Sequence, residues 1–280
     1  MAARIAAPIK RQPLITFFVL SYAITWPGWW LEAQGIQAGI IPGYFGPALA
    51  AIVVTIVTEG RPGLADLLGR LFRWRVPLRW YLVAVLVPAA SVLSVAAIPA
   101  LTSGGSTGFD PAPLRPILPE LAVVLVFGTL YGVMVAAGEE LGWRGYALPK
   151  LLARHNALVS SLIVGIVWGL WHLPVGFLFE SGNPALVDSL VYGLGVDLAA
   201  VIYTWLYRHT RGSVLIAALF HSAYDIFLIV GGQVAQVTGL EFSFRIHVLV
   251  LAGIAALLVV LAGPELGPKA REPAKDEPQP

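Results

Sequence analysis

Three short stretches of the chain combine acidic, basic and imidazole side chains within otherwise apolar sequence. They are EELGWR at 139–144, WGLWH at 168–172 and HSAYD at 221–225. A carboxylate and an imidazole together can activate water, because the carboxylate takes the proton while the histidine shares that task or holds a metal. A further polar group would have to stabilise the oxyanion that forms at an attacked carbonyl. The residue types therefore point to hydrolysis by an activated water.

The first stretch places two adjacent acids next to an arginine. If its helix continues to Pro149, Glu140 and Arg144 are four positions apart on one face, with the acid N-terminal to the base, which favours an ion pair. Glu139 then points about 100° away and shares a face with Trp143. The two acids thus have different neighbours and could have different roles. The alternative is a solvated charge pair that ends a membrane span.

The second and third stretches supply the histidines. His172 is predicted inside the fifth apolar segment, one turn after Trp168 and two residues before Pro174. By itself such a histidine is more often a core residue than a functional one. His221 and Asp225 are four positions apart on one predicted helix face, so the carboxylate could orient the imidazole. The alternative is a hydrogen bond between packed helices.

The two histidines differ in predicted depth. At about 1.5 Å per residue, His172 lies about 24 Å from Asn156, whereas His221 lies about 14 Å from Gly212. Tilt, or a fifth helix that begins below the membrane surface, is needed to bring both imidazoles to one site.

The composition indicates which kind of fold must position these residues. Of the 280 residues, 58% are hydrophobic and only 12% are charged, whereas a soluble domain is about 25% charged. A membrane-spanning helix needs about 20 mostly apolar residues. We predict an all-α polytopic membrane protein with about eight transmembrane helices, at residues 14–31, 43–58, 79–101, 119–139, 157–179, 185–207, 213–231 and 246–263.

The basic residues predict the orientation. Loops on the cytoplasmic side carry excess Lys and Arg. With the N-terminus inside, all of the 18 Lys and Arg except Arg115 and Arg245 fall on the inner side. We therefore predict cytoplasmic N- and C-termini in a bacterial inner membrane, with a single transmembrane domain at 1–265. The charged, proline-rich residues 266–280 are predicted to be a disordered cytoplasmic tail.

The basic linker at 60–78 has an amphipathic pattern. Five apolar residues fall on one helical stripe opposite arginines, which predicts a helix on the inner membrane surface. They are Leu64, Leu67, Leu68, Leu71 and Phe72. A plain positively charged loop is the alternative.

Small residues near the candidate site predict close helix contacts. Gly138 and Gly142 form one pair with this spacing, and Gly165 and Gly169 form another. Asp197 lies in the middle of the sixth segment without a motif around it, and we expect it to make a polar contact between helices.

Several classes of protein are excluded. The chain contains no cysteine, so disulfides and thiolate metal sites are absent. It has neither the HExxH pattern of zinc-dependent peptidases nor the GxSxG turn of α/β-hydrolases. The net charge of +2 is too small and too scattered for a nucleic-acid partner. The lipid bilayer is the one partner that the composition requires.

Together the three stretches resemble the motifs of the CPBP family. This membrane protease family comprises type II CAAX prenyl endopeptidases and bacteriocin-processing or immunity (Abi) proteins. The resemblance covers about residues 120–230, and the three motifs occur in the family's order. It implies an intramembrane fold of eight helices with a cavity open to the cytoplasm. It further implies hydrolysis of peptides or membrane proteins, prenylated or not, without a covalent intermediate.

The resemblance also implies roles for six residues. Glu140 and His172 would activate the water, His221 and residue 225 would support the oxyanion, and Glu139 and Arg144 would complete and hold the site. Because Glu139 is not tied to Arg144, it is an alternative candidate for the base.

The resemblance leaves the cofactor open. Family members have been described both as metalloproteases and as glutamate-dependent enzymes without tightly bound metal. A divalent metal such as zinc, if present, would have Glu140, His172 and His221 as ligands. No other cofactor is expected.

The chain departs from the prenyl endopeptidases at Asp225, where those enzymes have Asn. An amide donates a hydrogen bond to an oxyanion, whereas an ionised carboxylate cannot. Asp225 must then be protonated, orient His221 or bind a cation. The departure bears on whether substrates are prenylated.

Two other functions fit an intramembrane cluster of acids and histidines. One is a proton- or cation-coupled transporter, although the sequence shows no inverted repeat. The other is a non-catalytic bacteriocin-immunity membrane protein. The combined motifs favour an intramembrane endopeptidase over both.

Overall fold

The structure is a computed structural model that describes residues 2–102, 112–178, 186–239 and 243–267, and all regular structure in these ranges is helical. The helices are α1 (Ala2–Arg11), α2 (Pro13–Ala33), α3 (Ile40–Gly69), α4 (Leu78–Thr102), α5 (Leu118–Val123), α6 (Thr129–Glu140), α7 (Leu148–Leu152), α8 (Ala157–Trp171), α9 (Leu173–Leu178), α10 (Leu186–His209), α11 (Val214–Thr238) and α12 (Phe244–Ala262). Short 3-10 helices occupy Gln37–Gly39, Arg70–Phe72 and Ala112–Ile117, and π-helical turns occupy Val124–Gly128 and Leu141–Ala147.

Eight helical segments of the described residues are long and apolar enough to cross a membrane. They are Pro13–Ala33, Gln37–Phe72, Leu78–Val95, Ala112–Leu152, Ala157–Val175, Ser189–His209, Val214–Thr238 and Phe244–Ala262. The predicted all-α membrane protein with eight spans is thereby confirmed. The seventh span was predicted too short, since α11 runs on past residue 231 to Thr238.

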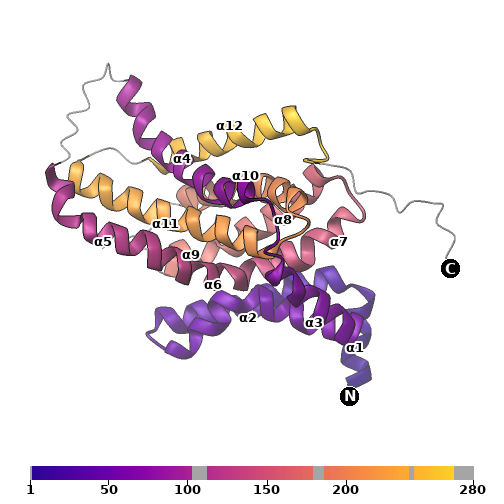
Figure 1. The fold of residues 1–280 in the computed structure, drawn as a ribbon. Helices are drawn as coiled ribbons and strands as arrows, with labels where there is room; N and C mark the ends of the chain where they lie inside the picture. The colour runs from indigo at the N-terminus through magenta and orange to yellow at the C-terminus, as the bar shows by residue number, and fades with distance from the viewer. Residues whose placement is uncertain (1, 103–111, 179–185, 240–242, 268–280) are drawn as a thin grey trace.

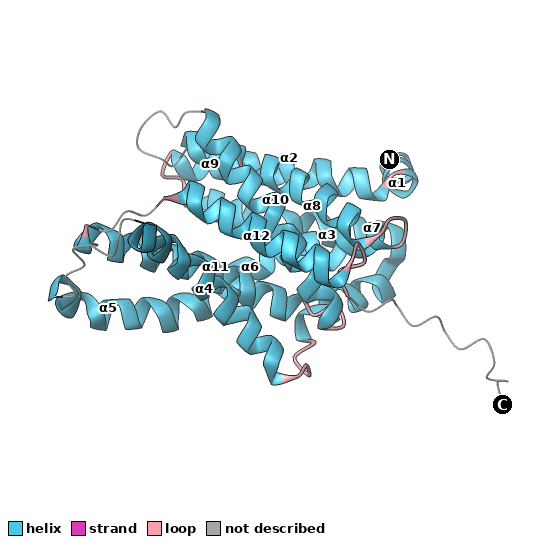
Figure 2. Cartoon of the chain, turned by 90° about the horizontal axis from the view of Figure 1, so that it is seen from above, coloured by secondary structure: helices cyan, strands magenta, loops and turns pink. Residues whose placement is uncertain are grey.

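The first helix and the last described segment are found at the same end of the bundle. In Figure 1, α2 and α3 form the lower side and α12 forms the upper side, with α10 and α11 between them. α1 and the segment after α12 lie at the same end of the bundle (Figures 1 and 2). There the backbone N–H of Leu158 donates to the carbonyl of Pro264 at 2.8 Å. An even number of spans requires this placement, and its cytoplasmic side stays a prediction.

The predicted disordered tail begins at the end of this segment. Its residues 268–280 lie outside the described residues. The division into a domain at 1–265 and a tail stays a prediction.

Close helix contacts occur where small residues predicted them. A methyl group at Gly142 would lie 2.6 Å from Pro47 Cβ of α3, and Gly138 packs against the same helix. On the other side of the bundle, Gly165 of α8 packs against Asp197 of α10. Since only glycine allows such approach, these contacts bring α3 and α10 close to the helices that carry the first two stretches.

The linker after the second span is largely helical. At Gly60, where φ is +67°, the chain turns sharply, and residues 61–72 then continue as an amphipathic helix. Leu67 on its inner face is only 3% exposed, whereas Phe72 at its end is 75% exposed. The predicted helix is present at residues 61–72, with Phe72 of the predicted apolar stripe exposed, and its place on the inner membrane surface stays a prediction. The alternative of a plain loop holds only for residues 73–77.

Candidate active site

The first stretch lies in the buried part of a long helical segment. α6 ends at Glu140, and the π-helical turn Leu141–Ala147 continues it into α7. Every residue from 138 to 148 is buried. π-Helical turns within α-helices are rare and occur frequently at functional sites. The helix continues to Leu152, so the condition for pairing Glu140 with Arg144 is met.

Glu140 accepts two hydrogen bonds, from an arginine and a histidine, through one oxygen. Its Oε1 accepts from Arg144 Nη1 at 2.8 Å and from His221 Nδ1 at 2.9 Å. The side chains of Glu140 and Arg144 are 0% and 1% exposed. The alternative of a solvated charge pair is therefore wrong, because the neighbouring helices cover both groups.

Two aromatic rings surround the buried guanidinium of Arg144. Its Cζ atom lies 4.1 Å from the ring centroid of Trp168 and 3.9 Å from that of Tyr203. A guanidinium over an aromatic face is attracted by the ring quadrupole, and the attraction is larger away from water. Tyr203 comes from α10, and sequence analysis missed it because no motif surrounds it.

Glu139 has a different environment. Its Oε2 accepts a hydrogen bond from Trp168 Nε1 at 2.9 Å, and the residue is 8% exposed. Among the ion pairs of the described residues, none includes Glu139. The two adjacent acids therefore differ: Glu140 is committed to Arg144 and His221, whereas Glu139 is held by one neutral donor.

His172 lies within the fifth span, Ala157–Val175, as predicted, and it occupies a junction between two helices there. α8 ends at Trp171, His172 caps it, and α9 begins at Leu173. Pro174 explains the break, because proline has no N–H and its ring clashes with the preceding turn. His172 Nδ1 lies 2.9 Å from the carbonyl oxygen of Trp168, which leaves its Nε2 for other partners.

One cavity brings both histidines together. Trp168, His172, His221 and Asp225 line it together with three tyrosines, and its volume is about 30 Å³. A cavity needs only about 10–15 Å³ of such space to hold a water molecule. Trp168 separates the two imidazoles, with ring centroids 5.7 Å from His172 and 5.4 Å from His221. The two imidazoles, which the sequence placed at different depths in the membrane, therefore line the same cavity in the folded protein.

Asp225 lies on the open side of this cavity. Its Oδ2 is 3.5 Å from His221 Nε2, and its side chain is 55% exposed. The predicted pairing of His221 with Asp225 is present, and His221 therefore lies between two carboxylates. Tyr192, Tyr203 and Tyr224 also line the cavity. Of these tyrosines, only Tyr224 belonged to one of the three stretches.

The contacts form two groups around Trp168. Glu140, Arg144, His221 and Asp225 form one continuous set of ion pairs. Glu139 and His172 are joined to each other through Trp168, which donates to one and accepts from the other. Glu140 and His172 form no hydrogen bond with each other in the described part of the chain. The water-activating pair implied by the resemblance thus has its members in different groups.

The same contacts bear on metal binding. Residues 2–102, 112–178, 186–239 and 243–267 contain no group of three or more His, Asp or Glu side chains placed to hold a metal ion. Glu140 Oε1 and His221 Nδ1 are hydrogen-bonded to each other, and His172 Nδ1 is hydrogen-bonded to the carbonyl of Trp168. This arrangement does not form the three-ligand set of Glu140, His172 and His221.

Comparison with known proteins identifies relatives of the chain. The family model described as Type II CAAX prenyl endopeptidase Rce1-like matches residues 120–227. The chain is also 29% identical over 234 residues to CAAX prenyl protease 2 of Methanococcus maripaludis. The aligned residues cover 76% of this chain and 82% of that protein. The family match includes all three stretches, at 139–144, 168–172 and 221–225. The predicted resemblance is confirmed for the prenyl endopeptidases, and its Abi branch stays a prediction.

Proposed function

We propose that this chain, an integral membrane protein that carries the Rce1-like domain of the type II CAAX prenyl endopeptidases, hydrolyses peptide bonds of membrane-associated substrates with a water activated by Glu and His. The observation that carries the proposal is the environment of the adjacent acids. Glu140 is fixed by Arg144 and His221, while Glu139 accepts a hydrogen bond from Trp168, and Trp168 lines a water-sized cavity. Intramembrane ionisable residues are costly and mark functional sites.

Glu139 is our candidate for the general base. Because Glu140 accepts from both Arg144 and His221, its charge is already balanced by partners that a proton transfer would disturb. Glu139 has no such partner and could take a proton from a water molecule, and its hydrogen-bond donor Trp168 lines the cavity. His172, held by the Trp168 carbonyl, presents Nε2 to the same cavity and would orient that water. In this assignment Glu140 and Arg144 position His221.

His221 is our candidate for stabilising the oxyanion. An imidazolium between Glu140 and Asp225 has an N–H on each nitrogen. The Nε2–H could turn from Asp225, at 3.5 Å, to the oxygen of an attacked carbonyl. Asp225 would then orient the ring and not donate to the oxyanion itself. This role accounts for a carboxylate where the prenyl endopeptidases have an amide.

The substrate we propose is a peptide or protein bound to the membrane. CAAX prenyl protease 2 is the name of the relative from Methanococcus, and a prenylated C-terminal peptide is the first candidate. The cavity would open to the cytoplasm of a bacterial cell, in line with the distribution of Lys and Arg.

The decisive experiment is peptide cleavage by the protein purified in detergent. The substrates are quenched fluorescent peptides with a farnesylated CAAX end and the same peptides without the farnesyl group. Glu139→Gln keeps an oxygen to accept from Trp168 but cannot act as a base, so we expect a loss of cleavage of about 10²–10⁴-fold. Glu59→Gln is the matched control, because Glu59 pairs with Lys150 at the surface. Absence of cleavage by well-folded wild-type protein would refute the proposal and favour transport or binding.

A chelator separates the two mechanisms. Cleavage that persists in chelator but is lost in Glu139→Gln supports water activated by glutamate alone. Cleavage that is lost in chelator and restored by zinc makes the protein a metalloprotease and overturns the metal-free assignment.

Two substitutions test Asp225. If it orients His221, Asp225→Asn keeps a hydrogen-bonding oxygen and retains cleavage. Asp225→Leu is expected to lower cleavage by about 10²-fold, as for a lost oxyanion contact. Wild-type rates in Asp225→Leu would remove Asp225 from the site.

A further inference from the structure

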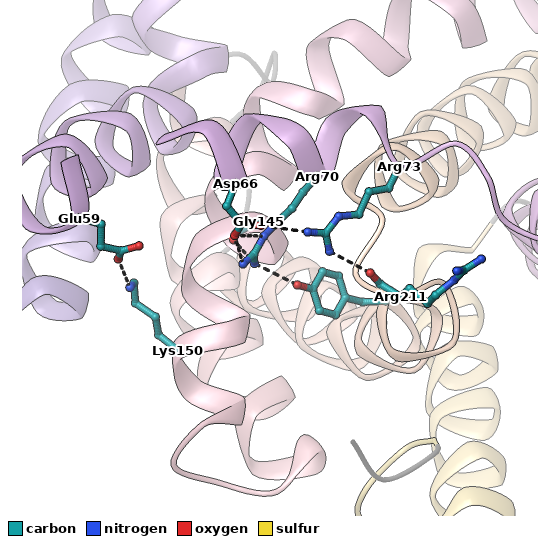
Figure 3. Close-up of polar contacts among 8 residues, drawn as sticks. Glu59, Asp66, Arg70, Arg73, Gly145, Lys150 and Arg211 are labelled. Carbon is teal, nitrogen blue, oxygen red and sulfur yellow. Dashed lines mark hydrogen bonds and ion pairs between the residues drawn. The ribbon is translucent and has the colours of Figure 1, made fainter. Parts of the chain in front are cut away.

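A second cluster of charged residues lies at the ends of four spans. Residues 73–77 connect the second span to α4, and residues 210–213 connect α10 to α11. The two connections are bonded side by side: Arg73 Nη1 donates to the Arg211 carbonyl at 3.0 Å, and Arg211 Nη2 donates to the Arg75 carbonyl at 3.0 Å. Figure 3 shows Arg73 reaching across to Arg211.

The backbone of this cluster is fixed. Ser213 Oγ donates to the Arg73 carbonyl at 2.7 Å. Arg211 has φ +56°, a left-handed conformation that a residue other than glycine keeps only where its surroundings determine it. The guanidinium groups of the cluster therefore project from a preformed surface.

These residues enclose a groove of about 470 Å³. Its lining includes Arg73, Arg75 and Arg211 together with Phe72, Trp74 and Thr210. Asp66 is the carboxylate paired with Arg73, at 3.1 Å, and it also pairs with Arg70 at 2.6 Å (Figure 3). Within the described ranges, neither Arg75 nor Arg211 forms an ion pair. The groove thus has an excess of positive charge.

Apolar side chains next to the arginines place the groove at the membrane boundary. The adjoining spans end at Phe72 and begin again at Leu78. Phe72, Trp74 and Leu78 are 75%, 58% and 71% exposed. Large exposed apolar side chains beside a basic groove are typical of the interface between lipid and water, where tryptophan is enriched.

We propose that this groove binds the phosphate headgroup of an anionic phospholipid. Arginine presents several N–H donors in a planar fork and binds phosphate oxygens in pairs. Basic pockets at the ends of transmembrane helices bind acidic headgroups. Phe72 and Trp74 would contact the glycerol and upper acyl region of the same lipid. Inorganic phosphate has no apolar part that could contact these side chains, so the lipid is the favoured ligand.

The groove is connected to the candidate active site through Arg70. Its Nη1 donates to the carbonyl of Gly145 at 2.8 Å, and Gly145 directly follows Arg144 (Figure 3). Asp66 joins Arg70 to Arg73 of the groove. Lipid binding is therefore expected to raise the thermal stability of the whole protein. The proposal does not depend on peptide cleavage.

The test measures lipid binding to delipidated protein in a neutral detergent by native mass spectrometry, with thermal stability as a second readout. The probes are phosphatidylglycerol, phosphatidylcholine and inorganic phosphate. Arg75→Gln is the main variant, because within the described ranges the Arg75 guanidinium stacks over Trp74 at 5.2 Å without an ion pair, and we expect its loss to leave the fold intact. Arg79→Gln is the matched control, since Arg79 stacks over Trp80 at 5.4 Å and does not line the groove.

We expect phosphatidylglycerol to bind and stabilise the protein, and phosphatidylcholine to do neither. Arg75→Gln should weaken binding about fivefold, from a contribution of about 1 kcal/mol per arginine near a headgroup. Arg79→Gln should leave it unchanged. An equal loss of phosphatidylglycerol binding in both variants would indicate non-specific electrostatic attraction to the protein surface and would contradict a specific site. Competition by millimolar inorganic phosphate would show a soluble ligand and overturn the lipid.

Discussion

Two regions of the molecule contain an acid and an arginine four positions apart on a helix. Glu140 and Arg144 in the candidate active site are joined at 2.8 Å, and Asp66 and Arg70 beside the basic groove at 2.6 Å. The local geometry is nearly the same. The surroundings differ, because the side chains of the first pair are 0% and 1% exposed and those of the second are 53% and 18% exposed. The spacing of four residues therefore accounts for both ion pairs, whereas burial determines how much each pair contributes to stability.

The energetic consequence follows from desolvation. An exposed pair contributes only about 0.2–1 kcal/mol, because water and salt screen it. Removing one partner of a buried pair costs about 3–5 kcal/mol, because the other charge stays buried without compensation. Arg70 of the exposed pair also donates a hydrogen bond to the Gly145 carbonyl in the buried region. The following predictions test this contrast.

The largest effect is expected for Glu140→Ala. It leaves Arg144 buried between Trp168 and Tyr203 without a carboxylate and removes the acceptor of His221. The free energy of unfolding should fall by about 3–5 kcal/mol. Unfolding by SDS in mixed micelles would measure it. A loss below that of Asp66→Ala would show that burial does not strengthen the dependence on the pair.

Arg70→Ala should have the next largest effect. It removes hydrogen bonds to the Gly145 carbonyl at 2.8 Å and to the Tyr207 hydroxyl at 3.2 Å. Hydrogen bonds from a charged group contribute about 1.5–3 kcal/mol. The same unfolding assay checks the value. If Arg70→Ala and Asp66→Ala cost the same, the contact with Gly145 contributes nothing.

Arg144→Lys tests the aromatic surroundings of the buried cation. Lysine keeps the charge near Glu140 but loses the planar guanidinium that lies over Trp168 and Tyr203. A loss of about 1–2 kcal/mol is expected from the desolvated cation–π contacts. Thermal unfolding followed by tryptophan fluorescence would detect it. An unchanged midpoint would mean that only the charge matters.

The smallest effect is expected for Asp66→Ala, at about 0.2–1 kcal/mol. The loss should shrink further in high salt, because the Debye length falls to about 3 Å at 1 M. Stability measured at low and high salt for Asp66→Ala and the parent protein gives the comparison. A loss of stability that is insensitive to salt would mean that the pair of Asp66 and Arg70 is shielded from solvent ions like the buried pair.

Much of the fold was predictable because hydropathy has local causes. Each span must supply its own apolar surface and backbone hydrogen bonds, so the eight spans could be identified from the sequence. Helical spacing likewise predicted the contacts of Glu140 with Arg144 and of His221 with Asp225. His172 lies in the predicted fifth span, and the helix break beside it follows from Pro174, which is visible in the sequence.

The amino-acid sequence by itself determined the class of protein, the number of spans and the candidate residues for chemistry, because these depend on composition and on spacing within single helices. Only the tertiary structure decided which residues meet across helices. It joined Glu140 to His221, Glu139 to Trp168 and Arg144 to Tyr203. These contacts depend on how glycines let α3 and α10 approach and on the tilt of each helix, which no single segment encodes. The different environments of the two adjacent glutamates arise from that packing.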